Sequence, residues 1–213
     1  MNRNKSILAE SITTRLSLAV DIADDYQESR IISDCNVYLQ DHDTQPVKNP
    51  GGYYIFLDIK GNNDTVLVQG GDHYFDNKSE KITFDELDTL SPVVHITLKP
   101  TPSYPFPSSA TLIRGCVIDT QNNGISGAAL TVKKTEFETQ TTTTGEFVIY
   151  FRGFNEYNIE TVNGKKMVKI DGKNPVLNIE HTDYRNNKGK ILKKKVTVEV
   201  EEGKTTLLSI TYP

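Results

Sequence analysis

The sequence contains no tryptophan, only two cysteines and no long apolar run, and each absence narrows the range of functions. Without tryptophan, a stacking surface for sugars or bases has to rely on the ten tyrosines. Cys35 and Cys116 lie far apart in the sequence, so they do not make the framework of a disulfide-stabilised fold. No stretch approaches the roughly 20 apolar residues of a transmembrane helix, so we expect no membrane span.

An excess of positive charge is also missing. The 24 Lys and Arg residues against 28 Asp and Glu residues give a net charge of −4, which argues against nucleic acid as a partner. Residues 1–16 lack the apolar segment of roughly 7–15 residues that a signal peptide needs. We therefore expect synthesis in the cytoplasm, and later release by another route, for example as part of a particle, stays open.

What the sequence does contain is alternation of apolar and polar residues. Over residues 16–22, Leu16, Leu18, Val20 and Ile22 fall on one face and the residues between them on the other. The same pattern recurs at 36–40, 53–59, 65–69, 93–99, 112–118, 129–134, 146–151, 157–162, 195–200 and 207–212. Such alternation predicts strands with one face in a core. Because turn residues separate these many short strands, we predict an all-β chain built from β-sandwiches.

The two halves of the chain match each other at constant offsets. Val37 matches Leu130 and Tyr54 matches Phe147, both 93 positions on. The first strands match at an offset of 97, and the last strands at 114. These offsets keep the apolar parity of every strand, so we predict two homologous modules in tandem.

Prolines at 100, 102, 105 and 107 mark the boundary between the halves and predict a semi-rigid, extended linker. The predicted organisation is an N-terminal arm over 1–14, a first module over 15–99, a linker over 100–110 and a second module over 111–213. The offset between matching residues rises from 93 in the middle of the modules to 114 at their last strands, which places an insertion at about 165–205 of the second module.

An ordered set of motifs in the second half resembles a known family. The set consists of RGCVID from Arg114, the NNG turn at 122–124, GAALTV from Gly127 and TTTTGEF from Thr141. It is similar to the carboxypeptidase regulatory-like domain, with Gly124 where that family has proline. The resemblance implies a seven-stranded sandwich of the transthyretin-like, immunoglobulin-like class that acts as a spacer, folding aid or adhesion element. The whole chain also resembles a two-module group that accompanies phage-tail-like contractile injection particles.

The motifs of catalysis and of nucleotide binding are missing. The glycines of residues 113–132 precede a predicted strand, whereas a phosphate-binding loop needs a following helix, so this stretch is a turn between strands. No histidine begins an H-x-x-E zinc motif, and no G-x-S-x-G occurs. His73 beside Asp72 could form an acid–base pair, but a solvated loop imidazole is the favoured alternative. We predict no catalytic residue, no cofactor and no enzyme activity.

The acidic turns leave one question about metals open. Asp21, Asp24 and Asp25, with Asp41 and Asp43, could gather oxygens for Ca²⁺, although their spacing is not that of an EF-hand loop. Hydrated acidic turns are the favoured alternative, so no metal site is predicted.

We expect the partners to be other proteins, reached through sheet edges, the N-terminal arm and the insertion, within an oligomeric assembly. The candidate partner-binding residues are Ile7, Leu8, Ile12, Arg185, Lys188, Lys190, Lys193 and Lys194. The lysine cluster could meet an acidic partner or phosphates, and a merely solvated hairpin is its alternative. The sequence thus predicts a non-catalytic structural spacer or adaptor in a larger assembly. The competing hypothesis is a carbohydrate or small-ligand binder that uses Tyr53, Tyr74 and Tyr157.

Overall fold

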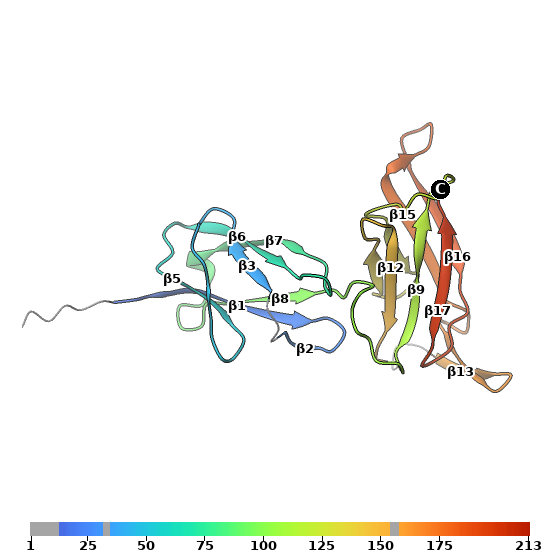
Figure 1. The fold of residues 1–213 in the computed structure, drawn as a ribbon, viewed down its shortest axis with the longest axis horizontal. Helices are drawn as coiled ribbons and strands as arrows, with labels where there is room; N and C mark the ends of the chain where they lie inside the picture. Colours follow the sequence, from blue (N-terminus) through green and yellow to red (C-terminus); the bar gives the residue numbers. More distant parts are fainter. Residues whose placement is uncertain (1–12, 32–34, 154–157) are drawn as a thin grey trace, which may run out of the picture. The chain divides into compact units, whose positions relative to one another are not determined.

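A computed structural model describes residues 13–31, 35–153 and 158–213, and these residues form two compact units (Figure 1). The first unit comprises the chain up to Asp24, Glu28–Gly70 and Asp76–Leu98. The second comprises Asp25–Gln27, Gly71–Phe75 and Lys99–Pro213. Both units are all-β, as predicted. In the described part of the chain, no helix has the length and apolarity that a membrane crossing needs.

Two sheets make up the first unit. One contains β1 (Leu16–Asp24), β2 (Ser29–Arg30), β4 (Val47–Lys48), β5 (Tyr54–Leu57) and β8 (Val93–Leu98). In it β8 runs parallel to β1 and β5 runs antiparallel. The other contains β3 (Asn36–Leu39), β6 (Asn63–Gln69) and β7 (Asn77–Thr83), and the short 3-10 helix η1 (Phe84–Glu86) follows. Alternate residues such as Leu18, Ile22 and Phe56 are fully buried, which is the expected signature of a sandwich core.

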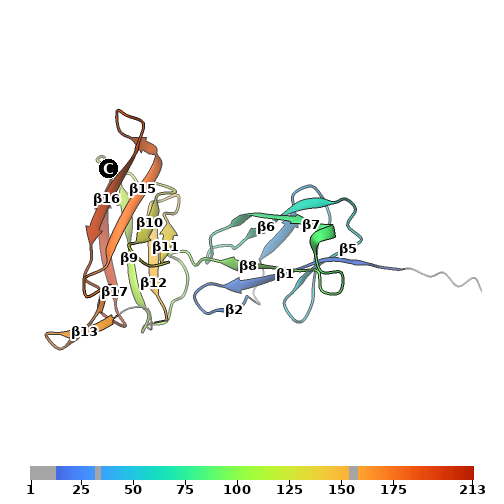
Figure 2. The ribbon, with the colours of Figure 1, turned by 180° about the vertical axis from the view of Figure 1, so that it is seen from behind.

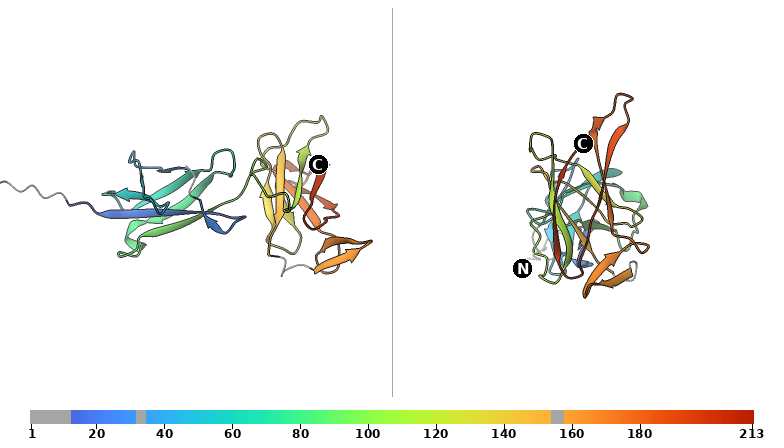
Figure 3. Two further views of the ribbon diagram at one scale, coloured as in Figure 1. Left: turned by 60° about the horizontal axis from the view of Figure 1, so that its bottom comes forward. Right: turned by 90° about the vertical axis from the view of Figure 1, so that its right-hand side faces the viewer.

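The second unit repeats this plan with more strands (Figure 2). One sheet has the order β12 (Glu146–Phe151), β9 (Thr111–Ile118), β17 (Thr205–Thr211). The other has the order β11 (Glu138–Gln140), β10 (Ala129–Val132), β15 (Val176–Arg185), β16 (Ile191–Thr197). A separate hairpin of β13 (Asn158–Val162) and β14 (Lys165–Lys169), orange in Figure 3, stands at one end. The buried core contains Ile113, Leu130, Phe147, Leu177 and Ile210.

Strand register shows how the two units correspond and corrects one expectation. β1 pairs antiparallel with β5 and parallel with β8, as β9 does with β12 and β17. Leu18 pairs with Phe56, and Ile113 pairs with Ile149. Ile113 lies 95 positions after Leu18, so the offset of 97 predicted for the first strands is two residues too large. A shift of two keeps every side chain on its face, so the apolar pattern alone does not detect it.

The glycine-rich stretch of residues 113–132 is a turn between strands, as predicted. The carboxylate of Asp119 accepts hydrogen bonds from the amides of Gln121 and Asn123, both at 2.8 Å. Asn122 adopts a left-handed conformation with φ of 64°. A Cβ on Gly124 would lie 2.0 Å from the carbonyl oxygen of Thr144, so only glycine fits there. The stretch leads into strand β10 rather than into a helix.

The proline-rich segment packs within the second unit. Pro100 pairs with Tyr74 in an isolated bridge, and the side chain of Tyr104 is buried. Arg114 of β9 donates a hydrogen bond of 2.7 Å to the carbonyl oxygen of Pro102 and lies over the ring of Phe106. The segment therefore covers part of the outer face of the β12-β9-β17 sheet.

Candidate interaction surface

The β15–β16 hairpin extends well past its sheet. β10 pairs with β15 only from Leu177 to Glu180, whereas β15 continues to Arg185. Beyond Glu180 the two strands of the hairpin have no third strand beside them among the described residues. Figures 1 and 2 show this part projecting beyond the other strands of the unit. Since it holds the predicted basic residues, we treat residues 181–192 as the candidate interaction surface, called here the basic hairpin.

A buried tyrosine anchors the base of the basic hairpin. Tyr212 is fully buried, and its hydroxyl donates to the carbonyl oxygen of Leu192 at 2.5 Å. The same hydroxyl accepts a hydrogen bond of 3.1 Å from the amide of His181. Burial raises the pKa of Tyr212, so the phenol keeps the proton that it donates. One side chain therefore binds both strands of the hairpin.

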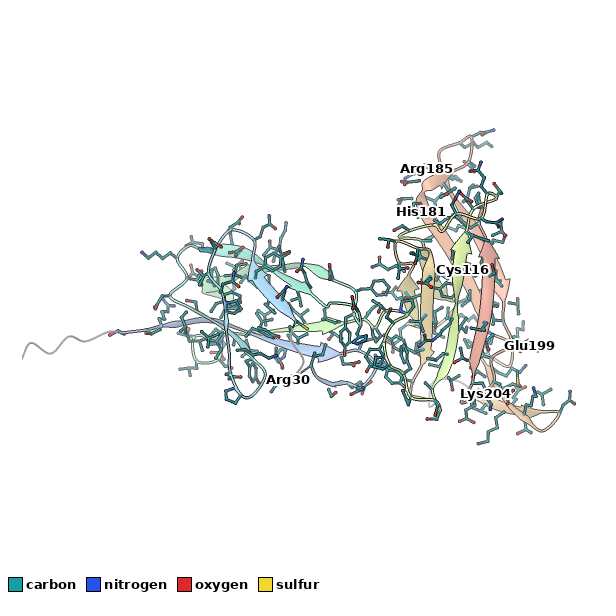
Figure 4. All side chains as sticks on the ribbon, in the orientation of Figure 1. Arg30, Cys116, His181, Arg185, Glu199 and Lys204 are labelled. Atoms are coloured by element: carbon teal, nitrogen blue, oxygen red, sulfur yellow. The ribbon has the colours of Figure 1, made fainter. Side chains whose placement is uncertain are left out.

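A row of edge-to-face aromatic contacts continues from this anchor toward the tip. The ring of Tyr184 meets that of Tyr212 at 5.4 Å between centroids, and His181 meets Tyr184 at the same distance. The Nε2 atom of His181 lies 2.9 Å from the carbonyl oxygen of Ser126. Figure 4 shows His181 and Arg185 along the hairpin. These contacts hold the hairpin in place although no third strand supports it.

The tip itself is an ordered turn. The side-chain oxygen of Asn186 accepts hydrogen bonds from the amides of Lys188 at 2.9 Å and Lys190 at 3.0 Å. Gly189 adopts a left-handed conformation with φ of 74°, which glycine supplies without strain. Arg185 donates to the carbonyl oxygen of Gly189 at 2.9 Å. The turn thus holds the backbone of both lysines in one conformation.

The predicted partner-binding residues differ in their surroundings. Lys188 and Lys190 are exposed at the tip, and their ammonium groups have no partner within the described part of the chain. Lys193 pairs with Glu180 at 2.7 Å, and Lys194 donates to the carbonyl oxygen of Thr211. Arg185, as noted, braces the turn. Ile7, Leu8 and Ile12 lie outside the described residues.

Sequence reasoning missed Tyr212 and Asn186, which shape the surface without carrying its charge. The alternating pattern of residues 207–212 predicted Tyr212 as the last residue of a strand. Only its hydroxyl distinguishes it from a core phenylalanine. Asn186 read as one of two adjacent asparagines in a polar segment. An asparagine two and four residues before the amides that it binds, with glycine between them, is the signal that could have indicated an Asx-type turn.

The first unit carries a polar network on β1 that the sequence did not predict. Arg30 donates to the carboxylate of Asp21 with two nitrogens and to the hydroxyl of Tyr53 at 2.7 Å. His95 lies 3.1 Å from the same carboxylate. The hydrogen bond from Arg30 lowers the pKa of Asp21. His95 is exposed on the face opposite Val94 and Ile96, as its alternation predicted.

His42 is held between two acceptors at the end of β3. Its Nδ1 atom lies 2.6 Å from the carboxylate of Asp64, and its Nε2 atom lies 2.6 Å from the carbonyl oxygen of Lys60. Only an imidazolium can donate to both. The hydrogen bond to Asp64, followed by that to Lys60, accordingly raises the pKa of His42.

The acidic residues considered for Ca²⁺ take separate partners. Asp21 binds Arg30 in the first unit, whereas Asp25 belongs to the second unit, where it binds Tyr150 and Arg152. No group of three or more metal-ligating side chains lies together in residues 13–31, 35–153 and 158–213.

The tyrosines considered for a ligand site have protein neighbours. Arg30 lies 4.0 Å above the ring of Tyr53, and Tyr74 packs edge-on against Tyr104. Tyr157 lies outside the described residues. His73, the one histidine weighed for acid–base chemistry, contacts the carbonyl oxygen of Ser103 at 3.0 Å.

Comparisons with known proteins give structural likeness without a family. No family model matches the chain, and no curated protein matches it. Among solved structures it is similar to a Streptococcal ancillary pilin, with 8% identity and a TM-score of 0.30 over 94% of this chain and 62% of that one. The Bacillus anthracis TIE protein matches with 13% identity and a TM-score of 0.32 over 92% of this chain and 33% of that one. The minor pilin of Streptococcus agalactiae matches with 11% identity and a TM-score of 0.28 over 92% of this chain and 95% of that one. The chain thus spans less than two thirds of the first two proteins.

Proposed function

We propose that the protein is a non-catalytic structural and interaction protein, a two-module adaptor that presents the basic hairpin to another protein. The observation that carries the proposal is the construction of this hairpin. Lys188 and Lys190 stand at the tip of an ordered turn, beyond the end of the sheet and without ion-pair partners in the described structure. A merely solvated loop does not need a buried tyrosine anchor and a row of edge-to-face aromatic contacts.

The chemistry of the tip selects the class of partner. Arg185, Lys188 and Lys190 face solvent with Asp183 as the acidic residue nearest in sequence. Because the turn is ordered before binding, little conformational entropy is lost when a partner engages it. An acidic protein surface fits best, because its negative charge attracts the basic tip and speeds association. A basic surface would be repelled by the same lysines. A large assembly is the setting that we propose, in agreement with the resemblance to particle-associated two-module chains.

A purification experiment tests this function. The full chain is affinity-purified from its native source beside two double variants, Lys188→Glu with Lys190→Glu and Lys133→Glu with Lys173→Glu. The second pair makes the same charge change at exposed positions outside the basic hairpin. We expect the tip variant to lose its partner protein, with recovery falling at least about tenfold, or about 1.4 kcal/mol. The control variant should retain the partner. Equal recovery with both variants would contradict the proposal.

The affinity-purified protein also tests whether the chain belongs to a large assembly. We expect wild-type protein to sediment with a large particle, and the tip variant to sediment as free protein. Recovery of wild-type protein as free chains alone would refute the assembly part of the proposal.

A further inference from the structure

Strand β17 forms an open edge of its sheet. It pairs with β9 only, in the order β12-β9-β17 (Figure 1). Lys204, just before the strand, accepts a hydrogen bond of 2.9 Å from the amide of Leu112, and Tyr212, just after it, donates one of 2.7 Å to Ile118. Main-chain groups alternate sides along a strand. The even-numbered residues therefore pair with β9, and the odd-numbered residues direct their N–H and C=O groups away from it.

The main-chain groups at the centre of this edge make no hydrogen bond with another described residue. At one end the carbonyl oxygen of Thr211 accepts from Lys194. No hydrogen bond from another described residue reaches the main chain of Leu207 or Ser209. The side chain of Leu207 is 76% exposed, which is unusual for a large apolar residue beside a free edge.

Other outer strands of the unit are protected in ways that β17 is not. β16 carries Lys193, Lys194 and Lys195, β11 carries Glu138, and β12 carries Glu146. Charged side chains on an edge are the usual device against strand pairing between molecules. β17, with the sequence TTLLSIT, has no charged residue and no proline. Among these outer strands, within the described residues, β17 is thus the one without a charged side chain.

We propose that β17 is the contact through which two copies of this chain associate, by antiparallel pairing of the two β17 strands. The pairing joins two three-stranded sheets into one continuous sheet. A two-fold contact sets a surface against itself, so it requires a strand without like charges to oppose one another. Within β17 itself no like charges oppose one another, and the partner strand lies beside its exposed leucine.

Size and charge set the strength of this contact. Outward-facing amides at two central residues and one leucine fall short of a standard stable interface, so we expect a dissociation constant of roughly micromolar or weaker. Lys194 and Lys204 lie near the two ends of the strand, and pairing brings like charges together there. Added salt should therefore strengthen self-association. Binding of an acidic partner by the basic hairpin should weaken with salt, so the two activities are distinguishable.

Sedimentation of the full chain tests the proposal. We expect a concentration-dependent dimer between about 10 µM and about 1 mM. Ser209→Pro removes an outward-facing amide and Leu207→Lys adds an edge charge, and each should shift the dissociation constant at least about tenfold. Thr97→Pro is the matched control, because Thr97 faces outward on β8, the equivalent edge of the first unit. It should leave the dimer unchanged.

Hydrogen exchange gives a readout on unaltered protein. The amides of Leu207 and Ser209 should exchange freely at low concentration and become protected as the dimer forms, while amides of β8 stay unchanged. A chain that remains monomeric over the whole range would overturn the proposal. So would a dimer that leaves both amides unprotected or that tolerates Leu207→Lys.

Discussion

At the scale of single residues, His42 is the clearest source of pH dependence in the first unit. Its ring donates to Asp64 and to the Lys60 carbonyl oxygen, and these bonds raise its pKa above the ordinary value of 6.5. Asp41 adds a weaker attraction. A group whose pKa is raised in the folded state contributes its full stabilisation below the unfolded pKa, and loses it as pH rises through the folded pKa.

We therefore predict that the free energy of unfolding of the first unit falls as pH rises above 6.5, the ordinary histidine pKa, and through the raised pKa of His42. His42→Gln should remove this slope, because glutamine does not titrate. Urea unfolding at a series of pH values measures it, with His95→Gln, an exposed histidine of the same unit, as the control. An undiminished slope in His42→Gln would show that the dependence arises elsewhere.

The stabilisation from Asp64 depends on pH in the opposite direction to that from His42. Burial opposes its ionisation, but hydrogen bonds from His42 and from the amides of Asp41 and Thr65 outweigh burial and lower its pKa. Its stabilisation is present above the ordinary carboxyl pKa of 3.8 and is lost as pH falls through the lowered value. The ion pair with His42 is therefore strongest between the two titrations, in mildly acidic solution.

Tyr212 lends itself to a test by removal of one atom. Tyr212→Phe keeps the buried ring but leaves the carbonyl oxygen of Leu192 and the amide of His181 without their partner. We expect a loss of about 1–3 kcal/mol in the stability of the second unit. Tyr184→Phe is the control, since the ring of Tyr184 supplies its contacts with Tyr212 and His181. Equal stability losses in urea unfolding of the two variants would contradict the anchoring role.

At the scale of elements, the tip of the basic hairpin depends on one side chain. Asn186→Ala removes the acceptor of the Lys188 and Lys190 amides. We predict that both amides exchange faster by roughly fivefold, which corresponds to about 1 kcal/mol for a lost hydrogen bond. The global stability should change little, because the tip buries no core residue. Asn187→Ala is the neighbouring control, and the same acceleration there would assign the effect to general loosening of the loop.

The strands that sequence reasoning found and missed differ in their surroundings. Residues 16–22 and 207–211 alternate because β1 and β17 each have one face in a core. Residues 146–151 form β12, whose two faces are both buried, and there a continuous apolar run marked the strand. Two-residue strands such as β2 and β4 are too short to show a period. β15 went unnoticed because its alternation of buried and less buried residues ends at Glu180, where the strand leaves the sheet.

For the candidate surface, the sequence showed which residues are charged but not which of them are paired. The lysines of residues 188–195 were visible as a run of charge. Which of them are paired depends on Glu180, the partner of Lys193, and on Thr211, the partner of Lys194, each more than ten residues away in the sequence. The open edge of β17 follows from strand order, and strand order is set by long-range pairing. A pattern of period two predicts which face of a strand is buried but not which strand lies beside it.

At the scale of the whole molecule, the net charge conceals two opposite fields. Residues 1–98 contain 8 Lys and Arg against 16 Asp and Glu, whereas residues 99–213 contain 16 against 12. The net charge of −4 is therefore the sum of an acidic half, with a charge of −8 (8 − 16), and a basic half, with a charge of +4 (16 − 12). Local charge rather than net charge governs which surfaces attract one another at short range, because salt screens interactions beyond roughly 10 Å.

This distribution leads to a prediction that the net charge alone would reverse. We expect the full chain to be retained by a cation exchanger at pH 7 and low salt, although it is acidic overall, because a local patch of positive charge such as the basic hairpin can bind the resin. Lys188→Glu with Lys190→Glu should elute at lower salt than Lys133→Glu with Lys173→Glu, which has the same net charge. Passage of the wild-type chain through the column without retention, or identical elution of the two variants, would show that the hairpin does not concentrate the positive field.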